Sequence, residues 1–222
     1  MEDLGGISID SLKNTYQVEG NVGLAFNIGL LQCFMLCLRT NACLTLFFKN
    51  ASRQCILHSK TFHYKSPTAM EIGWEAYLII DLTGRCPTNF LYYRPLDLCY
   101  RIEDGTHMNM EDPNIDIVSQ CYAKGSELIR VDSAEKQAYM EHALAGLPDT
   151  AYVCVQGSNY VVPGVWTYDD GIPFGYTNWE VGQPNGGNNP RNLGMDVSGT
   201  GLLWHDYPIP ESKTCSYVCE RR

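Results

Sequence analysis

The sequence predicts an α+β protein made of two small domains, each held together by its own disulfide bonds. The chain has 222 residues, a length that allows one large domain or two small ones. Four of its ten cysteines precede residue 81 and six follow it, so each part can pair its cysteines internally. The charge divides at the same place, because residues 1–80 have no net charge and residues 81–222 carry the whole net charge of -9. Both divisions predict a boundary at the turn-like segment 81–85.

The composition excludes several classes of partner. A hydrophobic fraction of 45% is that of an ordinary globular chain and not of a disordered one. The excess of acidic residues argues against nucleic acid, heparin and anionic membranes, because these partners need a basic surface. The most apolar run, residues 23–38, is shorter than the roughly 20 apolar residues that cross a bilayer, and it contains Asn27 and Gln32. We therefore expect no membrane span in this chain.

The cysteine content predicts an oxidising compartment. A high and even number of cysteines is typical of disulfide-bonded proteins made in the secretory pathway. Structural zinc is the alternative, but no two cysteines are separated by two residues, as most zinc sites require. We expect a secreted protein or one on the extracellular surface. The opening Met-Glu-Asp-Leu-Gly-Gly does not resemble a signal peptide, so a leader would have to lie outside this sequence.

The first part of the chain predicts a helix packed on an antiparallel hairpin. The apolar run 23–38 has helical periodicity, and we expect one buried face formed by Ile28, Leu31, Met35 and Leu38. The runs around Cys43 and Cys55 are strand-like and are separated by a polar turn at 49–53. Two bridges, Cys33–Cys55 and Cys37–Cys43, would join this helix to the sheet. Each would contribute about 2–4 kcal/mol to a domain of this size.

This arrangement resembles the PAN/apple family over residues 10–80. The helix with Cys-x3-Cys, the following cysteine, the aromatic-rich strand and the last cysteine-bearing strand match its pattern, although the end-to-end disulfide of apple domains is missing. The resemblance implies a non-catalytic module that binds proteins or glycans. The turn also contains Asn50-Ala-Ser52, a candidate N-glycosylation site at Asn50, with a chance match as the alternative. We expect His58 and His63 to be ordinary surface residues.

The second part predicts a mixed succession of strands and helices. Two aromatic strand-like segments lie between Cys86 and Cys99. Helical patterns follow at 118–124 and 133–144, the second capped by Ser133. A strand-like segment at 151–155 precedes a long Gly-, Asn- and Pro-rich loop, which we expect to extend over 178–201, and a last strand closes the chain.

Over residues 86–221 this order resembles a long-form C-type lectin-like domain. The motifs that carry the resemblance are Trp166-Thr-Tyr-Asp-Asp-Gly171, Tyr176-Thr-Asn-Trp179, Gln183-Pro-Asn185, Trp204-His-Asp206 and Tyr217-Val-Cys-Glu220. The resemblance implies that Cys86 pairs with Cys99, that Cys121 pairs with Cys219, and that the tryptophans of these motifs belong to the core. The family's second loop disulfide is missing, since position 193 is Leu and 207–209 contains no cysteine. By elimination we expect Cys154–Cys215.

The same resemblance locates a candidate ligand site. In sugar-binding members, calcium is bound by oxygen ligands at five motif positions, which fall here on Gln183, Asn185, Arg191, His205 and Asp206. Arg191 replaces an expected carboxylate and His205 an expected asparagine, and neither is a good ligand for a hard cation. We therefore expect a degenerate site without calcium or another cofactor. Weak calcium binding by Gln183, Asn185 and Asp206 is the alternative, and an alignment shift would add Asp196.

Nothing in the sequence predicts catalysis. It has no GxSxG, HExxH, phosphate-binding glycine loop or dinucleotide fingerprint, and the adjacent Asp169 and Asp170 cannot flank one bond. The predicted function is non-catalytic extracellular recognition of a glycan or protein ligand through the loop 178–201. Two alternatives remain: a calcium-dependent carbohydrate-binding lectin, and a structural or protein-interaction role of the PAN/apple-like domain with an inert lectin fold.

Overall fold

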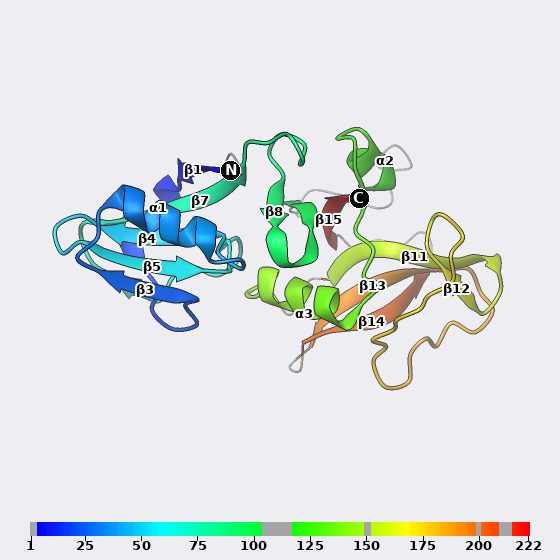
Figure 1. Ribbon diagram of the computed structural model, residues 1–222. Coiled ribbons are helices and arrows are strands. Elements are labelled where there is room, and N and C mark those ends of the chain that lie inside the picture. Colours follow the sequence, from blue (N-terminus) through cyan, green and yellow to red (C-terminus); the bar gives the residue numbers. More distant parts are fainter. Residues whose placement is uncertain (1–3, 104–116, 149–151, 199–200, 209–214) are drawn as a thin grey trace. The chain divides into compact units, whose positions relative to one another are not determined.

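The computed structural model describes residues 4–103, 117–148, 152–198, 201–208 and 215–222 (Figure 1). By their contacts the residues form two compact units. The first is Met1–Cys99 with His142–Gly146, and the second is Tyr100–Glu141 with Leu147–Arg222. The domain limits 10–80 and 86–221 stay a prediction. None of the helices in the described ranges is long and apolar enough to cross a membrane.

The first unit is built on a five-stranded antiparallel sheet in the order β1-β7-β4-β5-β3, with a separate pair of strands, β2 and β6. One helix, α1, lies across the sheet (Figure 1). The elements are β1 (Leu4–Ser8), a 3-10 turn (Asp10–Leu12), β2 (Thr15–Tyr16), β3 (Gly23–Phe26), α1 (Leu30–Arg39), β4 (Thr45–Lys49), β5 (Gln54–His58), β6 (Ala69–Met70), β7 (Trp74–Asp81), β8 (Leu91–Tyr93) and a second 3-10 turn (Arg94–Leu96).

The sheet of the first unit separates two apolar clusters, because neighbouring residues of a strand point to opposite faces. On β4, Phe48 belongs to the cluster that packs on α1, whereas Phe47 belongs to the cluster on the other face with Ile56 and Trp74. Two disulfides, Cys33–Cys55 and Cys37–Cys43, join α1 to β5 and to the residues before β4. These are the two pairs predicted for this part of the chain.

The apolar run 23–38 is not one helix, as predicted, but a strand followed by a helix. The chain turns at Asn27, whose φ is 60°, and α1 begins after Gly29, whose N–H donates to Gln32 Oε1 at 2.8 Å. The predicted buried face was also wrong at two positions, since Leu31 is 76% and Met35 is 43% exposed. The buried side of α1 is the one that carries its two cysteines, because the disulfides hold that side against the sheet.

His58 is fully buried, which corrects the prediction of a surface residue. It ends β5, and its ring packs edge-on against Phe47 and Phe62. Its Nε2 lies 2.7 Å from the carbonyl oxygen of Gln17, to which it donates as a neutral imidazole. Burial lowers the pKa of His58, because desolvation disfavours the charged form. His63 and the predicted glycosylation residue Asn50 are exposed.

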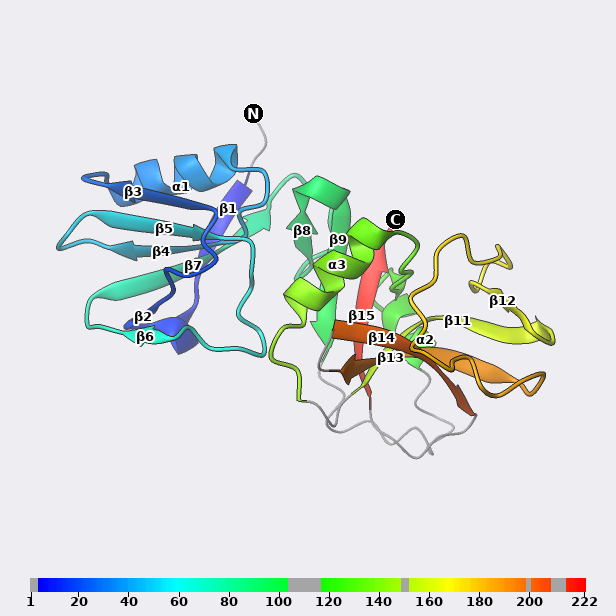
Figure 2. The ribbon, with the colours of Figure 1, turned by 90° about the horizontal axis from the view of Figure 1, so that it is seen from below.

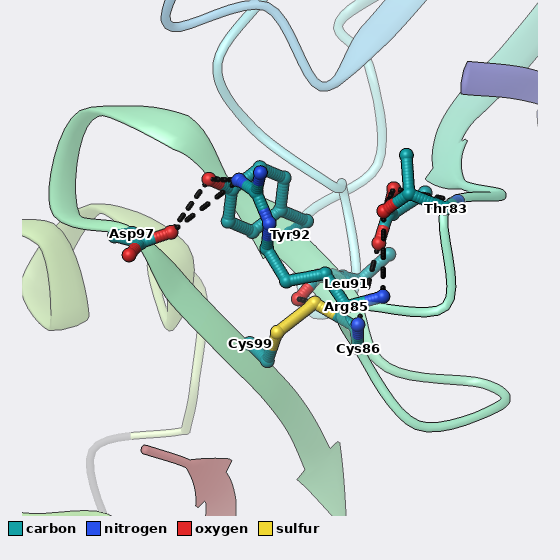
Figure 3. Close-up of a disulfide and its surroundings, with 8 residues drawn as sticks. Thr83, Arg85, Cys86, Leu91, Tyr92, Asp97 and Cys99 are labelled. Atoms are coloured by element: carbon teal, nitrogen blue, oxygen red, sulfur yellow. Dashed lines mark hydrogen bonds and ion pairs between the residues drawn. A yellow bond between two sulfur atoms is a disulfide. The ribbon is translucent and has the colours of Figure 1, made fainter. Parts of the chain in front are cut away.

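The Cys86–Cys99 disulfide closes the segment that leads into β9 (Figure 3). Beside it, the Arg85 guanidinium lies 4.7 Å from the ring centroid of Tyr92 and 3.5 Å from Asp97 Oδ1. The Tyr92 hydroxyl donates to the same carboxylate at 2.6 Å. This exposed cluster fixes the turn that the disulfide encloses.

The strands of the sheet in the second unit are ordered β14-β13-β11-β15-β9, with β10 beside β15 and β12 beside β11. Of its described pairings, β11–β15 is parallel, whereas β10–β15, β11–β12, β11–β13 and β13–β14 are antiparallel. Figure 2 shows α3 beside this sheet. The elements are β9 (Leu98–Glu103), α2 (Ile117–Tyr122), β10 (Glu127–Leu128), α3 (Ala134–Ala143), β11 (Tyr152–Val162), β12 (Val165–Thr167), β13 (Arg191–Ser198), β14 (Gly201–Pro208) and β15 (Cys215–Arg221).

Two long-range disulfides hold the second unit. Cys121–Cys219 joins α2 to β15, and Cys154–Cys215 joins the parallel neighbours β11 and β15. With Cys86–Cys99, the structure contains all five predicted pairs. The predicted cap of α3 is present, since the Lys136 N–H donates to Ser133 Oγ at 3.2 Å.

A buried network of charged and polar groups lies within the second unit. The Glu220 carboxylate is fully buried, and it accepts from the Arg130 N–H at 2.8 Å and from the Lys136 ammonium. The Arg130 side chain, also buried, pairs with Asp170 and lies 4.1 Å above the Tyr168 ring. The hydrogen bond from Arg130 lowers the pKa of Asp170. Each buried charge therefore has an opposite charge beside it.

Candidate functional site

The candidate site is built where the loop after β12 runs along strand β14. The Trp204 N–H donates to the Asn178 carbonyl at 2.9 Å, and the Glu180 N–H donates to the Trp204 carbonyl at 3.1 Å. These bonds cover the edge of β14, which is the first strand in the sheet order. Beneath the loop, Trp204 is buried, with Trp179 packed edge-on at a centroid distance of 5.6 Å.

The loop is shorter than the sequence predicted. It ends at Pro190, because residues 191–198 form β13, paired with β14 along its whole length. Leu193 and Met195 are buried on one face of that strand, and Val197 continues the alternation. This period of two is the strand signal, which the glycines and asparagines of the segment obscured.

Asp206 on β14 anchors the loop through its backbone. The side chain is only 1% exposed. Its Oδ1 accepts from the Asn185 N–H at 2.8 Å and its Oδ2 accepts from the Gly186 N–H at 2.7 Å. Both carboxylate oxygens are therefore used to fix the conformation of this loop segment.

Arg191, at the start of β13, brings a positive charge to the same carboxylate. Its Nε lies 3.9 Å from Asp206 Oδ2, and its backbone N–H donates to Asn159 Oδ1 at 2.7 Å. A Cβ added at Gly186 would collide with both Arg191 Nε and Asp206 Oδ2. Glycine is thus required for the loop to pass so close to this ion pair.

His205 lies among polar groups from the loop and from β13. Its Nε2 is 2.8 Å from Glu180 Oε2 and its Nδ1 is 3.1 Å from Gln183 Nε2. Asp196 Oδ2 lies 3.7 Å from Nδ1, and the other oxygen of Asp196 accepts from the Tyr207 hydroxyl. These contacts hold the His205 ring between the loop and β13.

The structure thus brings together the five residues that the sequence singled out, and it adds two. Glu180 contacts His205, and Asn159 closes the end of the loop, since its Nδ2 donates to the Asn189 carbonyl at 3.0 Å. Asn159 is buried on β11, and only its position opposite the loop in the folded chain gives it this role. The side chains of Asn185 and Asn188 are exposed.

These residues do not fit a calcium ion. Calcium requires six to eight oxygen ligands, several of them carboxylates. Here the one carboxylate among the five positions already accepts two backbone N–H groups, and a guanidinium lies next to it. Across the described ranges, no group of three or more His, Cys, Asp or Glu side chains is arranged to hold a metal ion.

Comparison with known proteins gives partial matches. No protein-family model matches the chain. It is 31% identical over 94 residues to a type-2 ice-structuring protein of Brachyopsis segaliensis, and the matched stretch covers 42% of this chain and 52% of that protein. It is 29% identical over 118 residues to the galactose-specific lectin nattectin of Thalassophryne nattereri, which covers 53% of this chain and 70% of the lectin. The match to the first relative therefore spans about half of its length.

Among solved structures, the carbohydrate-recognition domain of mouse scavenger receptor C-type lectin is similar over 62% of this chain and 98% of that domain, with a TM-score of 0.48 and 22% identity. The curated relatives support the C-type lectin-like domain that the motifs of residues 86–221 predicted. The PAN/apple-like assignment of residues 10–80 remains a prediction.

Proposed function

We propose that this chain is a non-catalytic extracellular recognition protein that binds a carbohydrate or protein ligand through the loop 178–190 without calcium. The observation that carries the proposal is the engagement of Asp206, whose two oxygens accept the Asn185 and Gly186 N–H groups beside the Arg191 guanidinium. An internal cation and two backbone donors satisfy the carboxylate that would otherwise serve a metal.

The exposed groups of the loop suit a hydroxyl-rich or polar ligand. Asn185 and Asn188 present amide side chains to solvent, and each amide can donate and accept hydrogen bonds.

The relatives support this class of function. One is named as a galactose-specific lectin and another as an ice-structuring protein, and both names describe binding and not catalysis. The five disulfides support an extracellular location, and the structure shows no free cysteine among the residues it describes. We infer that this chain binds its ligand through the side chains of its own loop and without the help of calcium.

A glycan array run with the full chain tests the proposal. The array is probed once with millimolar calcium and once with EDTA, and calcium binding is measured separately by calorimetry. We expect the same glycans to be bound in both conditions and no heat of calcium binding. The double variant Asn185→Ala with Asn188→Ala should weaken binding roughly tenfold, since each lost hydrogen bond contributes about 0.5–1.5 kcal/mol. Asn41→Ala, an exposed amide of the first unit, is the matched control.

Two outcomes would contradict the proposal. Binding that EDTA abolishes and Asp206→Ala removes would identify a calcium-dependent lectin. Binding that survives the loop variant unchanged would place the ligand site elsewhere, as expected for recognition by the PAN/apple-like part.

A further inference from the structure

A cavity of about 410 Å³ opens within the second unit. Its lining residues come from α2, β10, β11, β13 and β14 and from the turn after β12. They include no residue of the loop 178–190, which the structure describes in full, and none of the five residues of the candidate site. The volume lies in the range of roughly 300–1,000 Å³ that is usual for small-molecule sites. The cavity is therefore a second place where a ligand can bind.

Four tyrosines line this cavity, as an inner pair and an outer pair. Tyr152 is 4% exposed, and its ring stacks on that of Tyr207 with the centroids 4.7 Å apart. A Cβ added at Gly194 would lie 2.7 Å from the Tyr207 ring and 3.2 Å from Tyr152, so glycine is required for this inner pair to lie so close to β13. Tyr122 and Tyr160, the outer pair, are 57% and 42% exposed. The cavity thus offers aromatic faces to whatever enters it.

Acidic groups accompany these rings. Among the described residues that line the cavity, Asp169 is the one with a charged side chain. It can serve a ligand cation whatever else it binds, because a carboxylate accepts hydrogen bonds at two oxygens with about four lone-pair sites. The Tyr207 hydroxyl donates to Asp196. A hydroxyl that donates to a carboxylate leaves its ring richer in electrons, which increases the attraction of the ring for a cation.

The basic residues near the lining do not offset this negative character, because each has a carboxylate beside it. These pairs are Lys124 with Glu103 at 3.3 Å, Arg130 with Asp170, Arg191 with Asp206 at 3.9 Å, and His205 with Glu180 at 2.8 Å. None of these four basic residues lines the cavity. A cation in the cavity would therefore meet aromatic rings and a carboxylate before it meets a basic group.

Much of the remaining lining is apolar. Ile117, Leu128 and Leu193 are buried at the cavity and can contact the hydrocarbon part of a ligand. The polar side chain of Gln156 is already used within the protein, since its Oε1 accepts from Arg130 Nε at 3.3 Å and its Nε2 donates to the Leu128 carbonyl at 3.3 Å. The lining therefore favours a ligand that is mainly hydrocarbon and carries one positive charge.

We propose that this cavity binds a small organic cation with an apolar body, such as an alkyl- or arylammonium compound. The positive charge lies against the tyrosine rings with Asp169 as its counter-ion, and the hydrocarbon part contacts Ile117 and Leu128. An anion of the same size is excluded, because it would face the same electron-rich rings and the same carboxylate. This site goes beyond the loop function proposed above, since it uses none of the loop amides.

Three probes that share a benzyl group test the proposal. They are the cation benzyltrimethylammonium, the neutral benzyl alcohol and the anion phenylacetate. Each is titrated at constant ionic strength into the isotopically labelled full chain and followed by NMR. We expect the cation to bind and to shift the amide signals of Ser158, Tyr160 and Asn192, which line the cavity. Benzyl alcohol should bind at least about fivefold more weakly, and phenylacetate should not bind.

Substitution of Tyr160 separates recognition by an aromatic face from simple filling of the cavity. Tyr160→Leu keeps apolar bulk at an exposed position and should lower the affinity for the cation at least about fivefold, whereas Tyr160→Phe, which keeps the ring, should retain it. The affinity for benzyl alcohol shows whether the cavity is intact and should change less.

Substitution of the carboxylate tests the role of charge. Asp169→Asn should weaken binding of the cation at least about threefold, because it removes the counter-ion. Asp132→Asn, a matched change at an exposed residue of the same unit that does not line the cavity, should have no effect. The loop variant Asn185→Ala with Asn188→Ala should also leave the affinity for the cation unchanged, so a failure of the loop proposal can be told from a failure of this one.

Several results would overturn the proposal. These are no binding of benzyltrimethylammonium, equal affinity for the cation and for either of the other probes, or unchanged affinity in Tyr160→Leu. Amide shifts confined to residues outside the lining would place the cation elsewhere on the protein. Preferential binding of benzyl alcohol would show an apolar cavity that does not select for charge.

Discussion

The cores of the two units differ in the charge that they bury. Within the described residues, the first unit buries the polar side chains Thr45, His58 and Ser59. Only His58 among them can carry a charge, and burial lowers its pKa and so favours the neutral ring. The second unit buries four charged side chains, namely Arg130, Lys136, Asp206 and Glu220. The first core is therefore held mainly by apolar packing, whereas the second depends on pairs that are costly to break.

The disulfides differ in the same sense. The bridges within the five-stranded sheet and its helix span 22 and 6 residues of sequence, whereas those of the second unit span 98 and 61. Long bridges restrict the unfolded chain more than short ones. The first unit is thus cross-linked locally, and the second is closed by its final strand.

Removal of disulfides should give the largest difference in stability loss between the two units. Replacing Cys121 and Cys219 by alanine should lower the free energy of unfolding by about 4–5 kcal/mol, whereas replacing Cys37 and Cys43 should cost about 2 kcal/mol, since the loops differ in length. Urea unfolding followed by tryptophan fluorescence measures both. Equal losses would show that loop length does not set the contribution of these bridges.

Glu220→Gln should destabilise the second unit by about 3–5 kcal/mol, because it leaves the buried Lys136 ammonium without its counter-charge. Glu135→Gln, an exposed change on α3, should cost less than about 0.5 kcal/mol. Denaturant unfolding is the measurement. A small effect of Glu220→Gln would mean that the second core does not depend on its ion pair.

Asp206→Asn should loosen the loop without unfolding the unit. An amide can accept from only one of the two N–H groups that the carboxylate holds, so hydrogen exchange at Asn185 and Gly186 should accelerate at least about tenfold, equivalent to about 1.4 kcal/mol. Asp132→Asn, on an exposed residue, is the control. Unchanged exchange at both amides would contradict the anchoring role of Asp206.

The smallest effect should be the pH dependence of the first unit. Because burial lowers the pKa of His58, the unfolded chain takes up a proton there first as the pH falls. Stability from His58 should be complete above about pH 6.5 and should decline below it, by at most about 1.4 kcal/mol per pH unit. Thermal unfolding of wild type and His58→Gln between about pH 7 and 5 measures this.

The disulfide pairs and the residues of the candidate site could be predicted from the sequence, whereas the buried face of α1 could not. The five cysteine pairs and the five residues around Asp206 follow from spacing and family motifs. Leu31 and Met35 have the same helical periodicity as a buried face, and only the cross-links of Cys33 and Cys37 decide which side packs. Asn27 and Gly29 were the available signal that the strand ends before the helix begins.

Other features depend on contacts distant in sequence. Asn159 and Arg191 are 32 residues apart, and Lys136 and Glu220 are 84 apart. No local pattern marks such partners, because a buried lysine and an exposed one have the same spacing in a helix. The end of the loop at Pro190 was missed for a local reason, since glycine and asparagine masked the alternation of β13.

The bridge between Cys121 and Cys219 also determines what a protease can release from this chain. A single cut at any bond between these two residues leaves both fragments joined through sulfur, so the protein would migrate as one species until it is reduced. No bridge spans residues 56–85 or 100–120, and a cut in either segment would divide the chain at once. The exposed β11–β12 turn, residues 161–165, lies inside this stretch, so a cut there would not detach either side.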